Sequence, residues 1–199
     1  MQSPFHMVRG LFVVIAVAAA APASYAGYLQ LSGNVHTVEN ATVYRSGQLN
    51  ATDLDALIDS TGVRSILNLR GAHPDVAWYR EERDVARRRG IVYRSIAISA
   101  RNEPDVATMQ EIEQAMADAP KPLLIHCMGG SDRTGLASAI YEYAIAGKPE
   151  GVAADQLSFA YGHFPWLGSS TGAMDRAFER FVTFSEAATA AKPSTQESM

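Results

Sequence analysis

The stretch that decides the fold is Leu123-Leu124-Ile125-His126-Cys127-Met128-Gly129-Gly130-Ser131-Asp132-Arg133-Thr134-Gly135. Its short apolar start is typical of a strand buried on both faces of a sheet. An apolar helix over residues 134–146 follows, ended by Gly147. The loop between them therefore lies at the carboxyl end of a central strand and at a helix N-terminus. Unpaired N–H groups and the helix dipole favour anions at such a place.

The rest of the chain alternates strands and helices around this stretch. Alternating, β-branched patterns predict strands, and apolar residues at helical spacing predict helices. Residues 27–42 are only loosely patterned. The alternation predicts an α/β fold, with a central parallel-rich sheet flanked by helices. The expected strands are 43–45, 63–69, 91–98 and 123–125, and the expected helices are 52–60, 77–89, 105–117, 134–146, 152–161 and 172–190.

Composition limits the classes of partner. The chain has 199 residues, 47% of them hydrophobic, and a formal net charge of -4. The absence of a basic excess argues against nucleic acid or an anionic membrane as partner. A single cysteine excludes an intramolecular disulfide, and five scattered histidines lack metal-ligand spacing. We therefore expect no metal and no cofactor.

The N-terminus has the pattern of a secretory signal peptide. Arg9 precedes an apolar run from Leu11 to Ala21, and Ser24-Tyr25-Ala26 offers small residues for a signal peptidase. The run is shorter than the roughly 20 residues of a membrane span. We expect residues 1–26 to be removed, 27–190 to form one catalytic domain and 191–199 to be a disordered tail. The mature protein would then be periplasmic or secreted, without stable membrane insertion; an uncleaved N-terminal anchor is the alternative.

The loop itself indicates phosphate chemistry. Cys127 and Arg133 are separated by five residues, which is enough to wrap one phosphate in backbone N–H groups. The sulfur would then lie in line with the leaving oxygen, and the arginine would fork onto two phosphate oxygens. The same positive environment favours a thiolate on Cys127. Thr134 is placed to donate its hydroxyl toward that sulfur and assist its departure.

This pattern resembles the signature of the cysteine-based protein tyrosine and dual-specificity phosphatases. Tyr44-Arg45-Ser46-Gly47-Gln48 and Ile66-Leu67-Asn68-Leu69-Arg70 extend the likeness toward the atypical dual-specificity phosphatases, over Val43 to Ala146. The resemblance implies a protein tyrosine phosphatase-like fold with Cys127 as nucleophile and Arg133 as phosphate clamp. It also implies a substrate-binding loop made of Met128, Gly129, Gly130, Ser131, Asp132, Arg133 and Thr134.

Two aspartates are candidates for the general acid that protonates the leaving group. Asp105 lies upstream of the signature, where the wider family carries its acid, but it equally suits a helix cap. Asp132, inside the loop, resembles the loop aspartate of some secreted bacterial and lipid phosphatases, and its alternative role is to hold the loop. The sequence slightly favours Asp132.

The substrate is left open between several classes. We expect hydrolysis of phosphotyrosine, with phosphoserine and phosphothreonine as further substrates of a phosphoprotein partner. The alternatives are small metabolites such as inositol phosphates or phosphoinositides, and a non-catalytic phosphate-binding role. Met128 stands where lipid phosphatases often have a lysine, which weakens the lipid alternative. Arg45, Arg70 and Arg101 are candidates for the pocket mouth. Gly168-Ser169-Ser170-Thr171-Gly172 fits a serine-hydrolase elbow, but no histidine follows Ser170.

Overall fold

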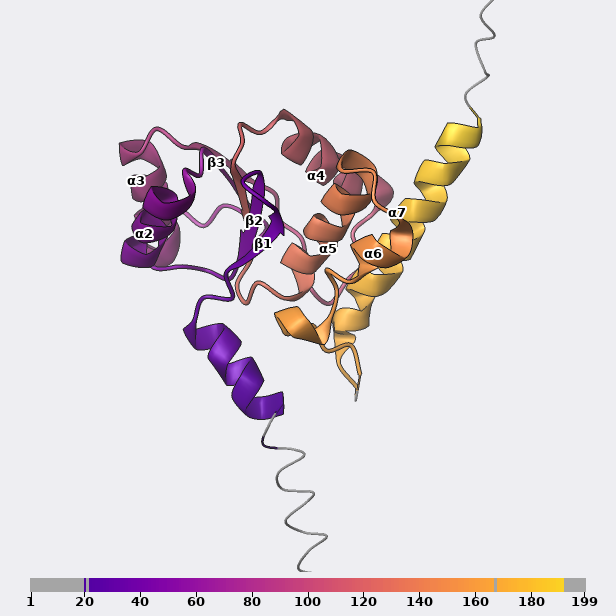
Figure 1. Cartoon of the computed structure of the whole chain (residues 1–199), viewed down its shortest axis with the longest axis horizontal. Helices are drawn as coiled ribbons and strands as arrows, with labels where there is room; N and C mark the ends of the chain where they lie inside the picture. Colours follow the sequence, from indigo (N-terminus) through magenta and orange to yellow (C-terminus); the bar gives the residue numbers. More distant parts are fainter. Residues whose placement is uncertain (1–19, 21, 167, 192–199) are drawn as a thin grey trace, which may run out of the picture.

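The computed structural model describes residue 20 and residues 22–166 and 168–191, and within them a sheet lies between two layers of helices (Figure 1). The expected alternation of strands and helices is confirmed. The strands are β1 (His36–Glu39), β2 (Val43–Ser46), β3 (Ser65–Asn68), β4 (Val92–Ser95) and β5 (Leu123–His126). The α-helices are α2 (Ala51–Thr61), α3 (Ala77–Arg88), α4 (Val106–Asp118), α5 (Asp132–Ile140), α6 (Glu150–Ala154) and α7 (Ala173–Ala190).

The sheet has the order β1-β2-β5-β3-β4, so β5 is its central strand. Strands β2, β5, β3 and β4 are parallel, and only β1 at the edge is antiparallel. Every residue of β5 is buried, as its apolar sequence predicts. Because β2 and β3 pair with β5 in the same direction, their carboxyl ends meet beside the loop that follows β5. That edge is where an open α/β sheet binds its ligands.

Each face of the sheet carries its own apolar core. The larger core joins β5 to α4, α5 and α7 through residues such as Ile125, Met109 and Phe178. The smaller one packs α2 and α3 on the other face, around Leu54 and Val85. Figure 1 shows these two helix layers on either side of the strands. The layers fix the position of β5 and α5, and therefore of the loop between them.

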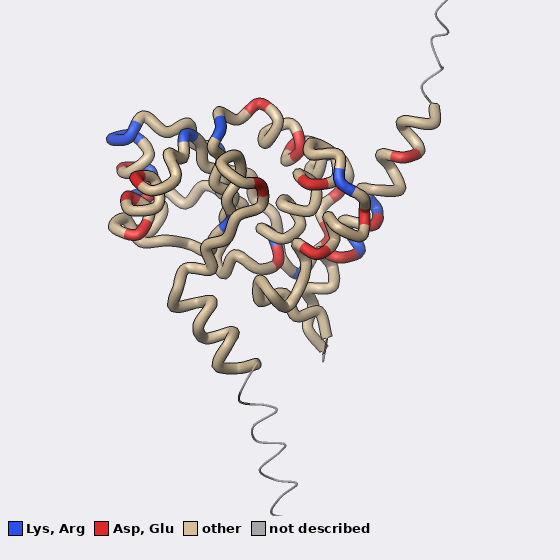
Figure 2. The backbone as a smooth tube through the Cα atoms, in the orientation of Figure 1, with Lys and Arg blue, Asp and Glu red and all other residues tan. Residues whose placement is uncertain are grey.

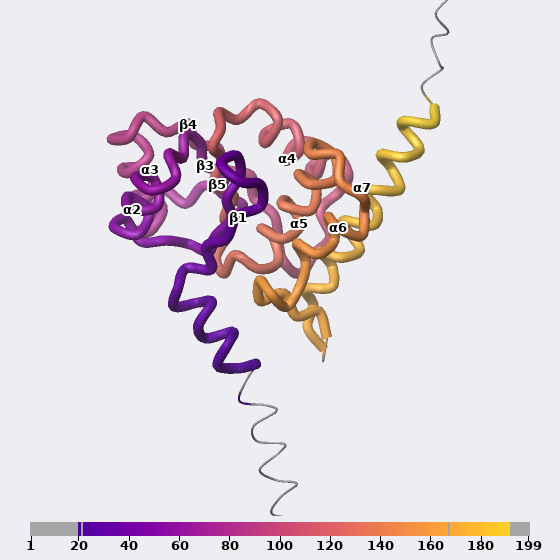
Figure 3. Tube along the Cα trace, in the orientation of Figure 1, coloured from indigo at the N-terminus to yellow at the C-terminus, as the bar shows by residue number. Residues whose placement is uncertain are grey.

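The segment before β2 is more ordered than its sequence indicates. Residues 22–31 form a helix and β1 follows it, where we expected a loose entry segment. Figure 3 shows this helix, in indigo, below the sheet. Most of the predicted signal peptide, and the tail from residue 192, lie outside the described residues. Within the described part of the chain, no helix is long and apolar enough to cross a membrane.

Several element ends differ from their expected positions for local reasons. Helix α2 begins at Ala51, one residue before its expected start, because the side chain of Asn50 caps it by accepting from the amide of Asp53. The expected helix over 134–146 begins earlier, at Asp132, and ends in a π-helix at Tyr141–Ile145. The expected helix over 152–161 is broken into α6 and a short 3-10 helix at Phe159–Tyr161.

Charged residues are spread over the surface of the fold. In Figure 2, acidic and basic positions are scattered over helices on both sides of the sheet. One dense group joins α2 to the end of α3, where Arg89 bonds Asp55 at 2.8 Å and Asp59 at 2.9 Å. The arginine run at 87–89 therefore contributes to helix packing through Arg89.

Candidate active site

The loop from Cys127 to Ser131 joins the central strand to α5, as the sequence predicts. Gly130 has φ +74°, a left-handed conformation that favours glycine. A Cβ at this position would lie 2.6 Å from the amide nitrogen of Gly47. The loop therefore turns in direct contact with the backbone that follows β2, and only glycine fits the turn.

The carbonyl groups of residues 128–131 in the loop all accept hydrogen bonds from outside the loop. The Met128 carbonyl accepts from the amide of Gln48 at 3.0 Å, and the Gly129 carbonyl accepts from Asn34 Nδ2 at 2.9 Å. The two carbonyls that follow accept from Arg45. Among the described residues, the amides of 128–131 donate no backbone hydrogen bond. Fixing the carbonyls outward leaves these amides free to converge on an anion.

Arg45 is the buried cation that holds the loop from below. It has 0% exposure, and its NH2 group donates to the Gly130 carbonyl at 2.7 Å and the Ser131 carbonyl at 3.3 Å. NH1 donates to the backbone oxygen of Gln156 at 2.8 Å and to its side-chain oxygen at 2.7 Å, and Tyr161 stacks on the guanidinium. Burial lowers the pKa of Arg45 to about 10, so it remains charged at neutral pH. The sequence made Arg45 a candidate for the pocket mouth, and that interpretation is wrong, because the side chain is buried against the loop carbonyls.

Arg133 and Cys127 occupy the two ends of the loop. Arg133 extends across the carboxyl edge of the sheet, where NH1 donates to the carbonyls of Leu69 at 3.3 Å and Ile98 at 3.4 Å. Its Nε is buried and has no hydrogen-bond partner among the described residues. Cys127 is only 3% exposed and forms no disulfide. The Thr134 hydroxyl donates to the Ser46 carbonyl at 3.5 Å, so in this structure it has a partner besides the expected sulfur.

A buried carboxylate, Glu82 of α3, lies behind His126. Glu82 is 4% exposed and accepts from His126 Nε2 at 3.0 Å, from the Tyr93 hydroxyl and from the Gln48 amide. Burial alone would raise the pKa of Glu82, but these bonds and the charge of His126 outweigh burial and lower it. Gln48 in turn accepts from Arg70 at 2.9 Å. The network fixes the strand end from which Cys127 projects.

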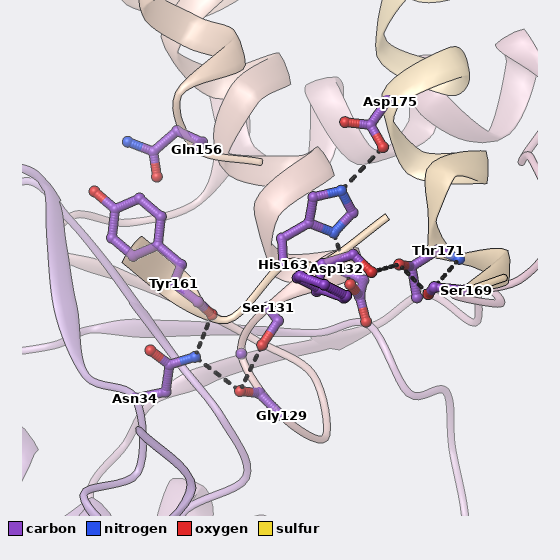
Figure 4. A network of polar contacts seen from close by, with 12 residues as sticks. Asn34, Gly129, Ser131, Asp132, Gln156, Tyr161, His163, Ser169, Thr171 and Asp175 are labelled. Carbon is purple, nitrogen blue, oxygen red and sulfur yellow. Dashed lines mark hydrogen bonds and ion pairs between the residues drawn. The ribbon is translucent and has the colours of Figure 1, made fainter. Parts of the chain in front are cut away.

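Asp132 stands in the first turn of α5 and is held by a histidine that the sequence did not indicate. His163 is fully buried, and its Nδ1 lies 2.7 Å from Oδ1 of Asp132. Its Nε2 lies 2.9 Å from Oδ2 of Asp175, on α7. Figure 4 shows the imidazole between the two carboxylates. Burial by itself lowers the pKa of His163, but the two carboxylates outweigh burial and raise it above its ordinary value.

The second acid candidate, Asp105, lies at the exposed start of α4. Its carboxylate accepts from the Thr108 amide at 2.8 Å, which is the geometry of an N-cap. That hydrogen bond lowers the pKa of Asp105. The structure therefore gives Asp105 the capping position that the sequence offered as its alternative role.

The remaining arginine candidates differ in their surroundings. Arg70 follows β3 at the carboxyl edge, and its guanidinium stacks 3.6 Å from the centre of the Trp78 ring. Burial and the charge of Arg133 lower the pKa of Arg70. The two arginines lie at the same sheet edge, because Arg133 NH1 donates to the carbonyl of Leu69, the residue before Arg70. Arg101 is exposed, on the loop before α4. Ser170 begins a 3-10 helix after a loop, so the serine-hydrolase elbow has no strand before it in the described residues.

Four supporting residues were missed by sequence reasoning: Asn34, Glu82, Gln156 and His163. Only Asn34 bonds the loop itself; the other three bond residues next to it, which are His126, Arg45 and Asp132. None of the four stands in a motif. His163 follows Gly162, which has φ +81° and lies against Ser131. A buried histidine after a glycine is too common a pattern to have indicated this contact.

The comparisons with known proteins agree with this geometry. The family model described as "Swiss Army Knife protein, DSP-PTPase phosphatase domain" matches residues 37–172, so the chain belongs to this dual-specificity-type phosphatase family. No curated protein matches the chain. A structure of Pseudomonas aeruginosa TpbA with phosphotyrosine has a TM-score of 0.62 at 21% identity, covering 81% of this chain and 93% of that one. The core catalytic domain of the PP-IP phosphatase SIW14 from S. cerevisiae, with citrate, has a TM-score of 0.57 at 18% identity, covering 80% and 94%.

Proposed function

We propose that the chain hydrolyses phosphomonoesters, phosphotyrosine above all, through a phosphocysteine on Cys127. The observation that carries this proposal is the buried Nε of Arg133, which lacks a partner beside a loop whose amides are also free. A phosphate in the loop would satisfy both, because arginine and successive amides match its oxygens. Unpaired buried donors are costly, and a bound anion removes that cost.

The reaction has two steps on this loop. The Cys127 thiolate attacks phosphorus, the ester P–O bond breaks, and the leaving oxygen takes up a proton from solvent. Water then attacks phosphorus and gives up a proton, the P–S bond breaks, and its electron pair returns to sulfur. Arg133 and the amides of 128–131 stabilise the equatorial oxygens in both transition states. The elements that place these groups are well buried: β5 at every residue and α5 from Thr134 to Ile140.

Two observations bear on the substrate. Cys127 is recessed, at 3% exposure, which supports an aryl ester long enough to reach it, as phosphotyrosine is. The TpbA structure holds phosphotyrosine, which supports the same proposal. Arg70, next to the Leu69 carbonyl that Arg133 contacts, favours a second candidate: a small metabolite with more than one phosphate, the kind of compound named for SIW14. Turnover of phosphotyrosine peptides and of inositol polyphosphates under matched conditions separates the two candidates.

The first experiment measures p-nitrophenyl phosphate hydrolysis in EDTA and reductant. We expect Cys127→Ser to reduce it to background and Arg133→Ala to lower kcat/KM by about 10²–10³-fold, because each removes transition-state stabilisation. Arg64→Ala, at an exposed position before β3, is the matched control and keeps full activity. Activity that survives Cys127→Ser would overturn the phosphocysteine mechanism.

A further inference from the structure

His163, which contacts Asp132, has no role in the mechanism above. His163 is fully buried and contacts two carboxylates at once, at 2.7 Å and 2.9 Å. Both ring nitrogens donate only in the protonated imidazole. The carboxylates come from different elements, Asp132 from α5 and Asp175 from α7, and these are the titratable groups that face the imidazole. Burying an imidazolium between two carboxylates costs desolvation free energy, so we looked to the reaction for its role.

We propose that His163, anchored by Asp175, is a positioning residue that holds Asp132 as the base for hydrolysis of the phosphocysteine. The proposal rests on the function proposed above. Its physical basis is the geometry, because His163 Nδ1 holds Oδ1 of Asp132 at 2.7 Å and thereby fixes the direction of the carboxylate. Asp132 stands in the first turn of α5, next to the loop that carries Cys127. Its Oδ2, which His163 does not contact, is the oxygen that can accept a proton.

The atoms of the step balance with water alone. Water attacks phosphorus of the phosphocysteine, one proton of the water moves to the Asp132 carboxylate, and the P–S bond breaks to return the thiolate. The proton then leaves Asp132 to solvent, since its side chain is 25% exposed. His163 keeps both of its protons throughout. Asp175 contacts His163 and not the loop, so it acts one residue further from the reaction.

Local packing gives His163 little freedom to move. Gly162 lies so close to Ser131 that a Cβ there would be 2.9 Å from its hydroxyl. One residue earlier, the Tyr161 carbonyl accepts from Asn34, which also donates to Gly129 of the loop (Figure 4). The two residues before His163 are thus both tied to the phosphate loop.

The test is transient kinetics of the full chain with p-nitrophenyl phosphate, followed by acid quench and intact mass. For Asp132→Asn we expect kcat to fall about 10²-fold or more, while kcat/KM, which reports the first step, stays within about threefold. For His163→Gln we expect the same pattern with a kcat loss of about tenfold. Both variants should show a burst of nitrophenol and accumulate phosphocysteine. Asp118→Asn, at the end of α4, is the control and stays like the wild type.

A double variant separates positioning from general damage. In His163→Gln the amide oxygen faces one of the carboxylates, so one contact becomes repulsive. His163→Gln with Asp175→Asn restores a donor on that side, and we expect it to recover part of the kcat lost in the single variant. Loss of kcat/KM without phosphocysteine in Asp132→Asn would overturn the proposal and indicate an acid role in the first step. Absence of phosphocysteine in every variant, with Cys127→Ser still active, would instead overturn the proposed function.

Discussion

At the scale of single residues, substitutions of Asp105 distinguish a helix-capping role from a role as general acid. Its carboxylate caps α4, and asparagine caps a helix as well as aspartate does. Asp105→Asn should therefore keep both the melting temperature and the hydrolysis of phenyl phosphate, whose basic leaving group needs an acid. Asp105→Ala should lower the melting temperature and leave kcat unchanged. A fall of about 10²-fold in kcat for Asp105→Asn would show that Asp105 is the general acid after all.

Loss of the Glu82 carboxylate should lower the stability of the fold. It is buried and accepts from three donors, which Glu82→Gln leaves partly unpaired. We expect the free energy of unfolding in urea at pH 7 to fall by about 2–4 kcal/mol. Glu81→Gln, the exposed neighbour, is the matched control and should change it little. A loss in Glu82→Gln no larger than in Glu81→Gln would contradict the buried network.

The stabilisation that Glu82 contributes should depend on pH in a definite direction. The pKa of Glu82 is lowered in the fold from its ordinary value of 4.5. Its stabilisation is therefore complete above about pH 4.5 and is lost as the pH falls through the lower, folded pKa. We expect the gap in unfolding free energy between wild type and Glu82→Gln to narrow below that pH. Urea titrations between pH 3 and pH 7 measure the gap.

At the scale of elements, the turn between β5 and α5 depends on Gly130. A Cβ there would meet the backbone of Ser46 and Gly47 within 3 Å, at a φ of +74°. Gly147 has a similar φ of +67° but open space around it, so it is the matched control. We expect Gly147→Ala to lower the free energy of unfolding by about 1–2 kcal/mol, the ordinary penalty of a left-handed residue. Gly130→Ala should lower it by at least about 2 kcal/mol more. It should also abolish binding of tungstate, an oxyanion probe.

Equal losses of unfolding free energy in Gly130→Ala and Gly147→Ala would contradict the close contact between the loop and the end of β2. Tungstate binding is measured by calorimetry at a temperature where both variants are folded. Retained binding in Gly130→Ala would show that the loop tolerates a wider turn than this geometry allows.

The elements that form the site differ in how far the sequence predicts them. The strand, the loop and the start of α5 are continuous in sequence, so their order and their polarity follow from local pattern. The break of α5 into a π-helix, and the early end of α6, depend on contacts with α4 and α7 that no local pattern contains. Strand β1 was missed because a four-residue edge strand carries little apolar alternation.

At the scale of the whole molecule, the site combines groups that only folding brings together. Arg45 bonds Gly130 across 85 residues, and His163 bonds Asp132 across 31. The roles of Cys127 and Arg133 are indicated by spacing along the loop, but the groups that orient the loop come from β2, α3 and the segment after α6. A buried arginine in a strand has the same sequence appearance as an exposed one, which explains the wrong placement of Arg45.

His163 connects the phosphate loop to α7, so its protonation should affect the stability of the whole domain. Its pKa is raised in the fold above the ordinary value of 6.5. The stabilisation is therefore complete below about pH 6.5 and is lost as the pH rises through the higher, folded pKa, because the neutral ring donates to only one carboxylate. At pH 6 we expect His163→Gln to lower the free energy of unfolding by about 2–4 kcal/mol.

The difference in the free energy of unfolding between wild type and His163→Gln should then become smaller as the pH rises toward 9. Urea unfolding at several pH values measures it, and His73→Gln, an exposed histidine outside this contact, serves as control with no such trend. A gap that stays constant across this range would mean that the imidazole is held by packing and not by its charge. In that case α7 would support the loop by shape alone, and the kinetic effects of His163→Gln and Asp175→Asn would no longer be linked through Asp132.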